Sequence, residues 1–439
     1  VQLVIALCMY VSMCLKLFKE SIINNRYLLP RWRSYYVAPS NISELQAFGA
    51  LVQQLELDVL GHPHPKREGV VLVRPEQIES FVSAMDSLGI SYRLHADDIK
   101  AKLDYDDMLI EEQRNASMAR NGGRQMPYDN YQEWEVIDAY MEDIANRFPQ
   151  ATIVTAANSF EGRPIRYLKI STTNFEDESK PVIVIDATLH AREWITPPTV
   201  TWAIRKLTED VTEPDLLERF DWILLPVANP DGYKFSFTNS RFWRKTRSTD
   251  QHSLSTICPG VDGNRNYDFF WNTVGTSTNP CTDTYGGSRA FSEIETRVVR
   301  DILNEHLHRI ALYLTMHSYG SMILYPWGHD GSLSNNAFAL HAVGVLMAAR
   351  IDALSLSHFP SYEVGNSLLV IGYGTSGAAE DYAHSIGVPL TYTYELPGLS
   401  GGFQGFHLPP RYIEQVSRET WAGIMAGVRR AGELFVPLS

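Results

Sequence analysis

The sequence has few cysteines, fewer basic than acidic residues and few long apolar segments. Each of these shortages excludes a class of protein function. None of its four cysteines forms a Cys-x-x-Cys pair, which argues against a cysteine-based metal site. The 38 basic residues are outnumbered by 51 acidic ones, for a net charge of −13. No basic cluster with interleaved aromatic residues is found, so we expect no nucleic-acid partner. There is also no internal repeat and no low-complexity tract.

The apolar stretch at residues 1–15 is shorter than the roughly 20 residues that span a bilayer. We interpret it as the apolar part of a signal peptide. The alternative is a truncated or misjoined N-terminus, because the sequence has no initiator Met, no basic leading region and no clear cleavage site. No other segment is long and apolar enough to cross a membrane, so we expect no membrane association.

Two further features agree with export to an oxidising compartment. Cys258 and Cys281 lie in one loop-like region rich in Pro, Gly, Thr and Asn. They favour a disulfide, which would place the protein outside the cytosol; two free thiols are the alternative. Asn41-Ile-Ser and Asn115-Ala-Ser match the N-glycosylation pattern. We therefore expect a secreted, extracellular protein, with the signal peptide and an unplaced segment at residues 1–33.

Residues 34–104 predict a small α+β module without a cluster of catalytic residue types. Apolar residues at helical spacing favour two helices, and short apolar runs favour three strands. The expected order is a strand at 34–37, a helix from Ser40 or Asn41 through Leu55, a strand at 69–73, a helix from Pro75 to Gly89, and a strand at 91–94.

Residues 105–124 differ in composition from the α+β module that precedes them. They are polar and end in a glycine-rich stretch that contains Arg120 and Arg124. Exposed connectors of this kind are preferred sites of proteolysis, so these two arginines are candidate cleavage points. An ordinary linker is the alternative.

Residues 125–439 alternate between strand-like and helical segments. The expected strands at 182–185 and 223–227 are almost continuously apolar, as in strands buried on both faces. We predict an α/β domain in which helices flank both faces of a mixed, largely parallel sheet.

Four polar residues follow strand-like segments in this domain. His190, His317 and Glu395 each end an apolar run, and Glu193 comes three residues after His190. Ligands of open α/β sheets bind at the carboxyl ends of strands. Two histidines and one glutamate with a fourth position left open form a catalytic zinc set. Asp262 could accept the spare N–H of a ligating imidazole. The alternative is a group of polar side chains that bind no metal.

Several motifs resemble the metallocarboxypeptidase family of pancreatic carboxypeptidases A and B. The resemblance extends from about Tyr35 to the end and includes the family's pro-domain. The matching motifs are Gly162-Arg-Pro-Ile165, His190-Ala-Arg-Glu-Trp-Ile-Thr196, Asn229-Pro-Asp-Gly-Tyr233, Phe242-Trp-Arg-Lys-Thr-Arg247, Asp262-Gly-Asn-Arg-Asn266, His317-Ser-Tyr319, Tyr373-Gly-Thr-Ser-Gly377 and Glu395-Leu396.

The resemblance implies a zinc carboxypeptidase that acts on peptide and protein C-termini. His190, Glu193 and His317 would hold one zinc ion, which lowers the pKa of a bound water to about 7. Glu395 would take the proton of the water and pass it to the leaving amine. Arg244 would stabilise the oxyanion that develops at the scissile carbonyl.

The resemblance also implies how substrate binds. Asn264, Arg265 and Tyr373 would bind the terminal carboxylate, because arginine meets a carboxylate with two hydrogen bonds. Subsites further from the terminus would be lined by Arg192, Tyr319 and Phe406. Cys258 and Cys281 match the family's loop disulfide.

The family position that sets specificity corresponds to Glu380. A buried carboxylate there would favour C-terminal Lys or Arg, and the alternative is a preference for apolar or aromatic residues. Leu368 is also expected to line the pocket. Asp381 is adjacent, so an alignment error of one residue would exchange the two carboxylates. The loop at 397–405 departs from the family's usual sequence.

By the same resemblance, residues 34–104 form an inhibitory pro-domain that a trypsin-like protease removes by cutting after Arg120 or Arg124. We expect a monomer. The alternative functions are a non-catalytic binding protein on this fold and a zinc amidohydrolase that acts on small acylated amino acids.

Overall fold

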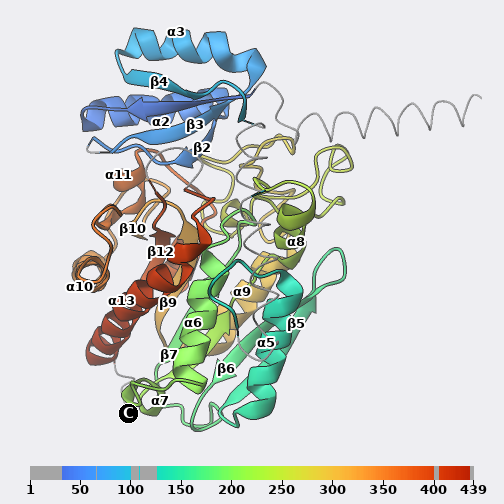
Figure 1. Ribbon diagram of the computed structural model, residues 1–439, viewed down its shortest axis with the longest axis vertical. Coiled ribbons are helices and arrows are strands. Elements are labelled where there is room, and N and C mark those ends of the chain that lie inside the picture. The colour runs from blue at the N-terminus through green and yellow to red at the C-terminus, as the bar shows by residue number, and fades with distance from the viewer. Residues whose placement is uncertain (1–31, 66, 100–107, 109–125, 400–404, 436–439) are drawn as a thin grey trace, which may run out of the picture.

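The computed structural model describes residues 32–65, 67–99, 108, 126–399 and 405–435. Within these residues the chain forms a small N-terminal domain above a larger one (Figure 1). Residues 1–31, Asn115, Arg120 and Arg124 lie outside the described residues, so the predicted signal peptide and cleavage points are not described. No helix in the described part of the chain is long and apolar enough to cross a membrane.

The N-terminal domain is a four-stranded antiparallel sheet with two helices on one face. The strand order is β2-β3-β1-β4. Asn41 caps the first helix by accepting a hydrogen bond from the Glu44 N–H, and Gly89 ends the second at φ 68°. The elements are β1 (Arg33–Ala38), α2 (Ile42–Leu55), β2 (Asp58–Gly61), β3 (Gly69–Val73), α3 (Ile78–Leu88) and β4 (Ser91–Ala96).

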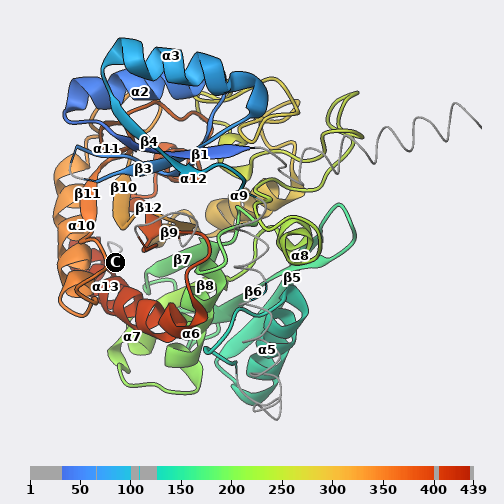
Figure 2. The same cartoon turned by 45° about the horizontal axis from the view of Figure 1, so that its top comes forward.

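All of these elements except β2 were predicted from the sequence. This strand has four residues and begins three residues after the end of α2, so it is too short for a periodic pattern to reveal it. Figure 2 shows α2 and α3 as the outer layer, with the small sheet between these helices and the larger domain.

The larger domain is built on an eight-stranded mixed sheet in the order β11-β10-β12-β9-β7-β8-β6-β5. Its centre is parallel, with β12, β9, β7 and β8 in neighbouring positions. The strands are β5 (Ala151–Asn158), β6 (Pro164–Ile170), β7 (Val182–Ala187), β8 (Asp221–Leu225), β9 (Ile310–Ser318), β10 (Met322–Tyr325), β11 (Glu363–Asn366) and β12 (Thr391–Leu396).

Helices cover both faces of this sheet, as predicted. On β7, Ile183 and Ile185 belong to an apolar cluster that includes residues of α5, α6, α10 and α13. Val182 and Val184 point to the other face, as the two-residue period of a strand requires, and belong to a second cluster that includes residues of α9 and α12. The helices are α5 (Trp134–Arg147), α6 (Thr196–Thr208), α7 (Asp215–Glu218), α8 (Pro230–Thr238), α9 (Ile294–His306), α10 (Ala337–Asp352), α11 (Ser367–Ile371), α12 (Ala379–Ser385) and α13 (Ile413–Leu434).

The parallel register brings the predicted site residues to one edge of the sheet. β9 and β12 align His317 with Glu395, and β7 pairs with β9 up to Ala187, three residues before His190. The N-terminal domain covers this same edge. There Leu60 and Leu72 of its sheet share an apolar cluster with Phe242 and Phe406.

Candidate metal centre and active site

Three buried side chains converge at the edge of the sheet. His190 Nδ1 lies 2.8 Å from Glu193 Oε1, and His317 Nδ1 lies 3.0 Å from Glu193 Oε2. The two Nδ1 atoms are 2.9 Å apart. All three residues are at most 3% exposed, and together they form a group that could hold a metal ion. Nitrogen and carboxylate lone pairs aimed at one point are the donor set that zinc prefers.

Electrostatics agree with a cation at this point. Burial opposes ionisation of Glu193, but His190 and His317 outweigh it and hold the pKa of the carboxyl below its usual range. Burial also disfavours a charged His317, yet the Glu193 carboxylate raises the pKa of that imidazole to about 9. The Glu193 carboxylate therefore favours a positive charge in this buried site. A bound metal ion would supply that charge.

Asp262 contacts Nε2 of His190, the ring nitrogen that faces away from Glu193. His190 Nε2 lies 2.9 Å from Asp262 Oδ1. The other oxygen, Oδ2, accepts hydrogen bonds from Arg244 Nε at 3.1 Å and Nη2 at 2.8 Å. Because Nε2 is bonded to the carboxylate, Nδ1 is the nitrogen left for a metal. Arg244 is fixed beside the same centre, with Nη1 3.2 Å from His190 Nδ1.

Glu395 lies on β12 next to the metal ligands. It is aligned with His317 across the parallel pair, and its Oε2 is buried without a hydrogen bond within the described residues. Burial and the neighbouring Glu193 carboxylate raise its pKa to about 8. A carboxylate with a pKa near neutrality can both accept and return a proton.

Asn264 and Arg265 stand at the end of a short turn that Asp262 caps. Asn264 Oδ1 accepts the Ala379 N–H at 2.8 Å. Arg265 is 6% exposed, and its guanidinium donates to Gly275 O and to Asn264 O at 2.8 Å each. Burial lowers its pKa. A guanidinium held rigidly in a cavity is suited to bind a carboxylate.

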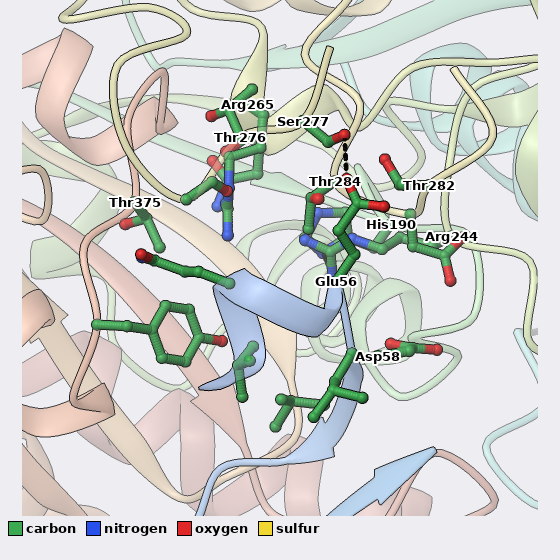
Figure 3. Close-up of a pocket in the computed structure, with 18 of the residues that line it drawn as sticks. Glu56, Asp58, His190, Arg244, Arg265, Thr276, Ser277, Thr282, Thr284 and Thr375 are labelled. Atoms are coloured by element: carbon green, nitrogen blue, oxygen red, sulfur yellow. Dashed lines mark hydrogen bonds between the residues drawn. The ribbon is translucent and has the colours of Figure 1, made fainter. Parts of the chain in front are cut away.

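A cavity of about 390 Å³ connects these groups, and both domains line it. Figure 3 draws this cavity. Glu56 and Asp58 reach into it from the N-terminal domain, and His190, Arg244 and Arg265 line it from the larger domain. Asn264 and Tyr373, the other two residues expected to bind the substrate carboxylate, line the cavity as well.

Glu380 lines the cavity and Asp381 does not. Glu380 Oε1 accepts a hydrogen bond from Ser367 at 3.2 Å, while its buried Oε2 has no hydrogen bond among the described residues. Burial and the adjacent Asp381 raise the pKa of Glu380 to about 7. Asp381 instead accepts the Gly328 N–H at 2.9 Å and holds a neighbouring loop.

Arg192, Tyr319 and Phe406, the residues expected to line the subsites further from the terminus, contact one another, and Arg192 also lines the cavity. The Arg192 guanidinium lies 4.7 Å over the Phe406 ring, and the ring of Tyr319 is 5.0 Å from that of Phe406. Leu368 is placed elsewhere: it packs against Gly331, and the same helix, α11, lines the cavity through Ser367 and Ile371. Cys258 and Cys281 form a disulfide.

Two residues of the N-terminal domain that contact the site were not predicted from the sequence. Asp58 forms an ion pair with Arg192, and His62 Nδ1 lies 3.3 Å from the Tyr373 hydroxyl. Burial lowers the pKa of His62 to about 3, so this histidine is neutral in the cleft. Neither residue belongs to a motif, and no sequence signal links them to partners so distant in the chain.

Comparisons with known proteins agree with this geometry. Residues 137–423 match the zinc carboxypeptidase family, and residues 35–106 match the carboxypeptidase activation peptide. The chain is 67% identical over 405 residues to a carboxypeptidase B of Helicoverpa zea, covering 92% of this chain and 94% of the relative. It is 35% identical over 369 residues to a human carboxypeptidase B, covering 82% and 84%.

A solved structure is also similar. The crystal structure of carboxypeptidase A from Helicoverpa armigera superposes with a TM-score of 0.86 at 43% identity, covering 92% of this chain and 98% of that one. The relatives thus include proteins named carboxypeptidase B and proteins named carboxypeptidase A.

Proposed function

The chain belongs to the zinc carboxypeptidase family and includes its activation peptide, and from that premise we propose a secreted zymogen whose enzyme removes C-terminal Lys and Arg. The observation that supports this specificity is Glu380, a buried carboxylate in the cavity with one oxygen that makes no hydrogen bond within the described residues. A substrate ammonium or guanidinium would supply the missing partner.

His190, Glu193 and His317 would hold the zinc ion, which supplies the Lewis acid and lowers the pKa of a water. Glu395 would accept a proton from the attacking water as the water oxygen adds to the scissile carbonyl carbon. Arg244, oriented by Asp262, donates to the oxyanion that forms. Glu395 then returns the proton to the peptide nitrogen, and the C–N bond breaks to release the terminal amino acid.

Asn264, Arg265 and Tyr373 would bind the free carboxylate of the substrate. Arg265 is the buried cation of this group, and its guanidinium is held by two backbone carbonyls. Because the carboxylate of an internal residue is tied up in a peptide bond, this group selects the chain terminus. Arg192, Tyr319 and Phe406 would contact residues further from the terminus.

Removal of apolar C-terminal residues is the second candidate. It is favoured by the raised pKa of Glu380, about 7, since a protonated carboxyl no longer attracts a cation. It is also favoured by Ile371 and Leu324 in the cavity lining. On this basis the preference for Lys and Arg increases as the pH rises through about 7.

The zymogen organisation is part of the proposal. Residues 34–104 would be the inhibitory pro-domain, residues 105–124 the connector, and residues 125–439 the enzyme. A trypsin-like protease would cut after Arg120 or Arg124. The disulfide between Cys258 and Cys281 supports secretion, because such bonds persist in oxidising compartments.

The test is hydrolysis of matched peptides ending in Arg, Lys, Phe or Leu, before and after trypsin, with and without a zinc chelator. We expect chelator-sensitive release of Arg and Lys only after trypsin. Release of Phe or Leu instead would leave the reaction intact and overturn the specificity.

Two variants isolate the charge at residue 380. Glu380→Gln keeps the size of the side chain, and Glu380→Ile also removes its polarity. Removing one partner of a buried ion pair costs at least about 2 kcal/mol, so kcat/KM for Arg-terminated peptides should fall on the order of 30-fold relative to Phe-terminated ones. An unchanged ratio in both variants would contradict the assignment.

A further inference from the structure

The two histidines of the metal centre are held in different ways. His190 Nε2 contacts a carboxylate directly, Asp262 Oδ1 at 2.9 Å. His317 Nε2 instead faces a hydroxyl, Thr315 Oγ1, at 3.3 Å. The family's site residues, as assigned above, give no role to Thr315.

Behind Thr315 lies a buried carboxylate. Thr315 donates to Asp186 Oδ1 at 2.9 Å, and the Tyr313 hydroxyl donates to Asp186 Oδ2 at 2.5 Å. Asp186, Thr315 and Tyr313 are each at most 1% exposed. Asp186 makes no ion pair with Lys or Arg anywhere in the described ranges, although burying a lone carboxylate is costly.

The strand register explains why these groups meet. Residues 313, 315 and 317 of β9 alternate with residues on the opposite face, so Tyr313, Thr315 and His317 share one side. In the parallel pair, Asp186 of β7 is aligned with Thr315. Hydrogen bonds therefore connect His317 of the metal centre to Thr315, and Thr315 to Asp186 inside the sheet.

The donor and acceptor of each hydrogen bond follow from the tautomer of His317 and from the single hydroxyl proton of Thr315. His317 Nδ1 points at Glu193 and His190, so it is the metal-facing nitrogen, and Nε2 bears the proton. Nε2 then donates to Thr315 Oγ1. The single hydroxyl proton of Thr315 is donated to Asp186, because an ionised carboxylate only accepts.

We propose that Asp186 is a positioning residue that acts through Thr315 to fix the tautomer and ring orientation of His317 and to strengthen metal binding. The inference rests on the proposed assignment of His317 as a metal ligand. Outer-shell partners of this kind typically change metal affinity by about 10- to 100-fold. The competing explanation is that Asp186 only satisfies Tyr313 within the core.

The test measures zinc affinity of the intact zymogen by competition with a chelator of known affinity, so it needs no substrate turnover. The variants are Thr315→Val, Thr315→Ser, Asp186→Asn and Tyr313→Phe. Thr391→Val is the matched control: Thr391 is a buried residue of the adjoining strand, aligned with Tyr313, and its hydroxyl makes no hydrogen bond within the described residues.

We expect Thr315→Val and Asp186→Asn to weaken zinc binding by about 10- to 100-fold. Combining them should weaken it no further, because both break one chain of hydrogen bonds. Thr315→Ser should retain wild-type affinity, since the hydroxyl remains. Thr391→Val and Tyr313→Phe should change affinity little.

Wild-type zinc affinity in Thr315→Val would overturn the inference, and so would equal losses in Thr315→Val and Thr391→Val. Thermal unfolding of the chelator-treated variants identifies losses that arise from destabilisation alone. If Asp186→Asn does not fold, Thr315→Val and its serine counterpart decide the question. Failure of the wild-type zymogen to bind zinc would refute the metal site itself, which is a separate outcome.

Discussion

Asp58 of the N-terminal domain and Arg192 of the larger domain form a two-point ion pair across the cleft. Asp58 Oδ2 lies 2.8 Å from Arg192 Nη1, and Oδ1 lies 2.8 Å from Nη2. Arg192 is 1% exposed. Burial opposes ionisation of Asp58, but Arg192 outweighs it and lowers the pKa of the carboxyl. The pair therefore links the pro-domain to a residue of the proposed substrate subsites.

Asp58→Asn should make the zymogen active before trypsin treatment. The change leaves the Arg192 guanidinium buried without its anion, which costs at least about 2 kcal/mol and favours departure of the pro-domain. We expect activity before cleavage to rise on the order of tenfold, measured with the peptide that the mature enzyme prefers. Activity after cleavage should be unchanged, because Asp58 leaves with the pro-domain.

Glu68→Gln is the matched control for Asp58→Asn. Glu68 pairs with Arg93 inside the N-terminal domain, and the side chains of both residues are largely exposed. Exposed ion pairs contribute little to stability, so the Glu68→Gln zymogen should remain inactive before trypsin treatment. If the Asp58→Asn zymogen is also inactive before cleavage, the ion pair between Asp58 and Arg192 does not hold the pro-domain in place.

A second contact between the domains depends on a glycine. A Cβ at Gly49 of α2 would lie 2.5 Å from Gly372 O and 3.0 Å from Tyr373 Cβ. Gly49→Val should therefore separate α2 from the Tyr373 loop and raise activity before cleavage. Ala50→Val adds a similar side chain at the next, exposed position and should have no effect. Equal activities of the two zymogens would contradict a close contact at Gly49.

The metal centre could be predicted from sequence because each of its residues follows an element with a clear signature. His317 and Glu395 lie at the ends of apolar strands, and parallel strands end at the same edge of a sheet. The two helices of the N-terminal domain were predictable for a similar reason, since their apolar residues recur at helical spacing over about three turns or more.

Contacts between distant segments had no such signature. Asp58 and Arg192 are brought together by the docking of two domains, and neither residue is unusual in its own segment. Thr315 and Asp186 lie inside apolar strands, where one polar residue gives no indication of its partner. Leu368 was assigned to the cavity by analogy, but the turn of α11 directs Ser367 and Ile371 there instead.

Glu395→Gln should abolish hydrolysis while zinc stays bound. Glutamine has the size of glutamate but accepts no proton, and positioned general bases typically contribute about 10²- to 10⁴-fold. We expect kcat to fall within that range, with little change in KM. The zinc content of the purified variant should equal that of the wild type. A kcat within threefold of the wild-type value would exclude Glu395 as the base.

Stability should depend on pH through Glu419 of α13. Glu419 is fully buried, and its Oε2 accepts a hydrogen bond from Gln415 at 2.8 Å. Burial raises its pKa from 4.5 to about 7. As the pH rises from 4.5 to 7, the unfolded chain releases this proton and the folded protein keeps it, so stability falls. Above about pH 7 the full penalty remains.

Glu419→Gln should remove this penalty, because the amide keeps the shape and one acceptor oxygen but never ionises. The melting temperature of the variant zymogen should exceed that of the wild type at pH 8, and the difference should shrink towards zero as the pH falls to 4.5. Other groups titrate equally in both proteins, so the difference between them reports residue 419. Glu414→Gln, on the exposed face of the same helix, should give no such trend. A difference between wild type and Glu419→Gln that stays constant from pH 4.5 to 8 would show that Glu419 does not titrate in this range.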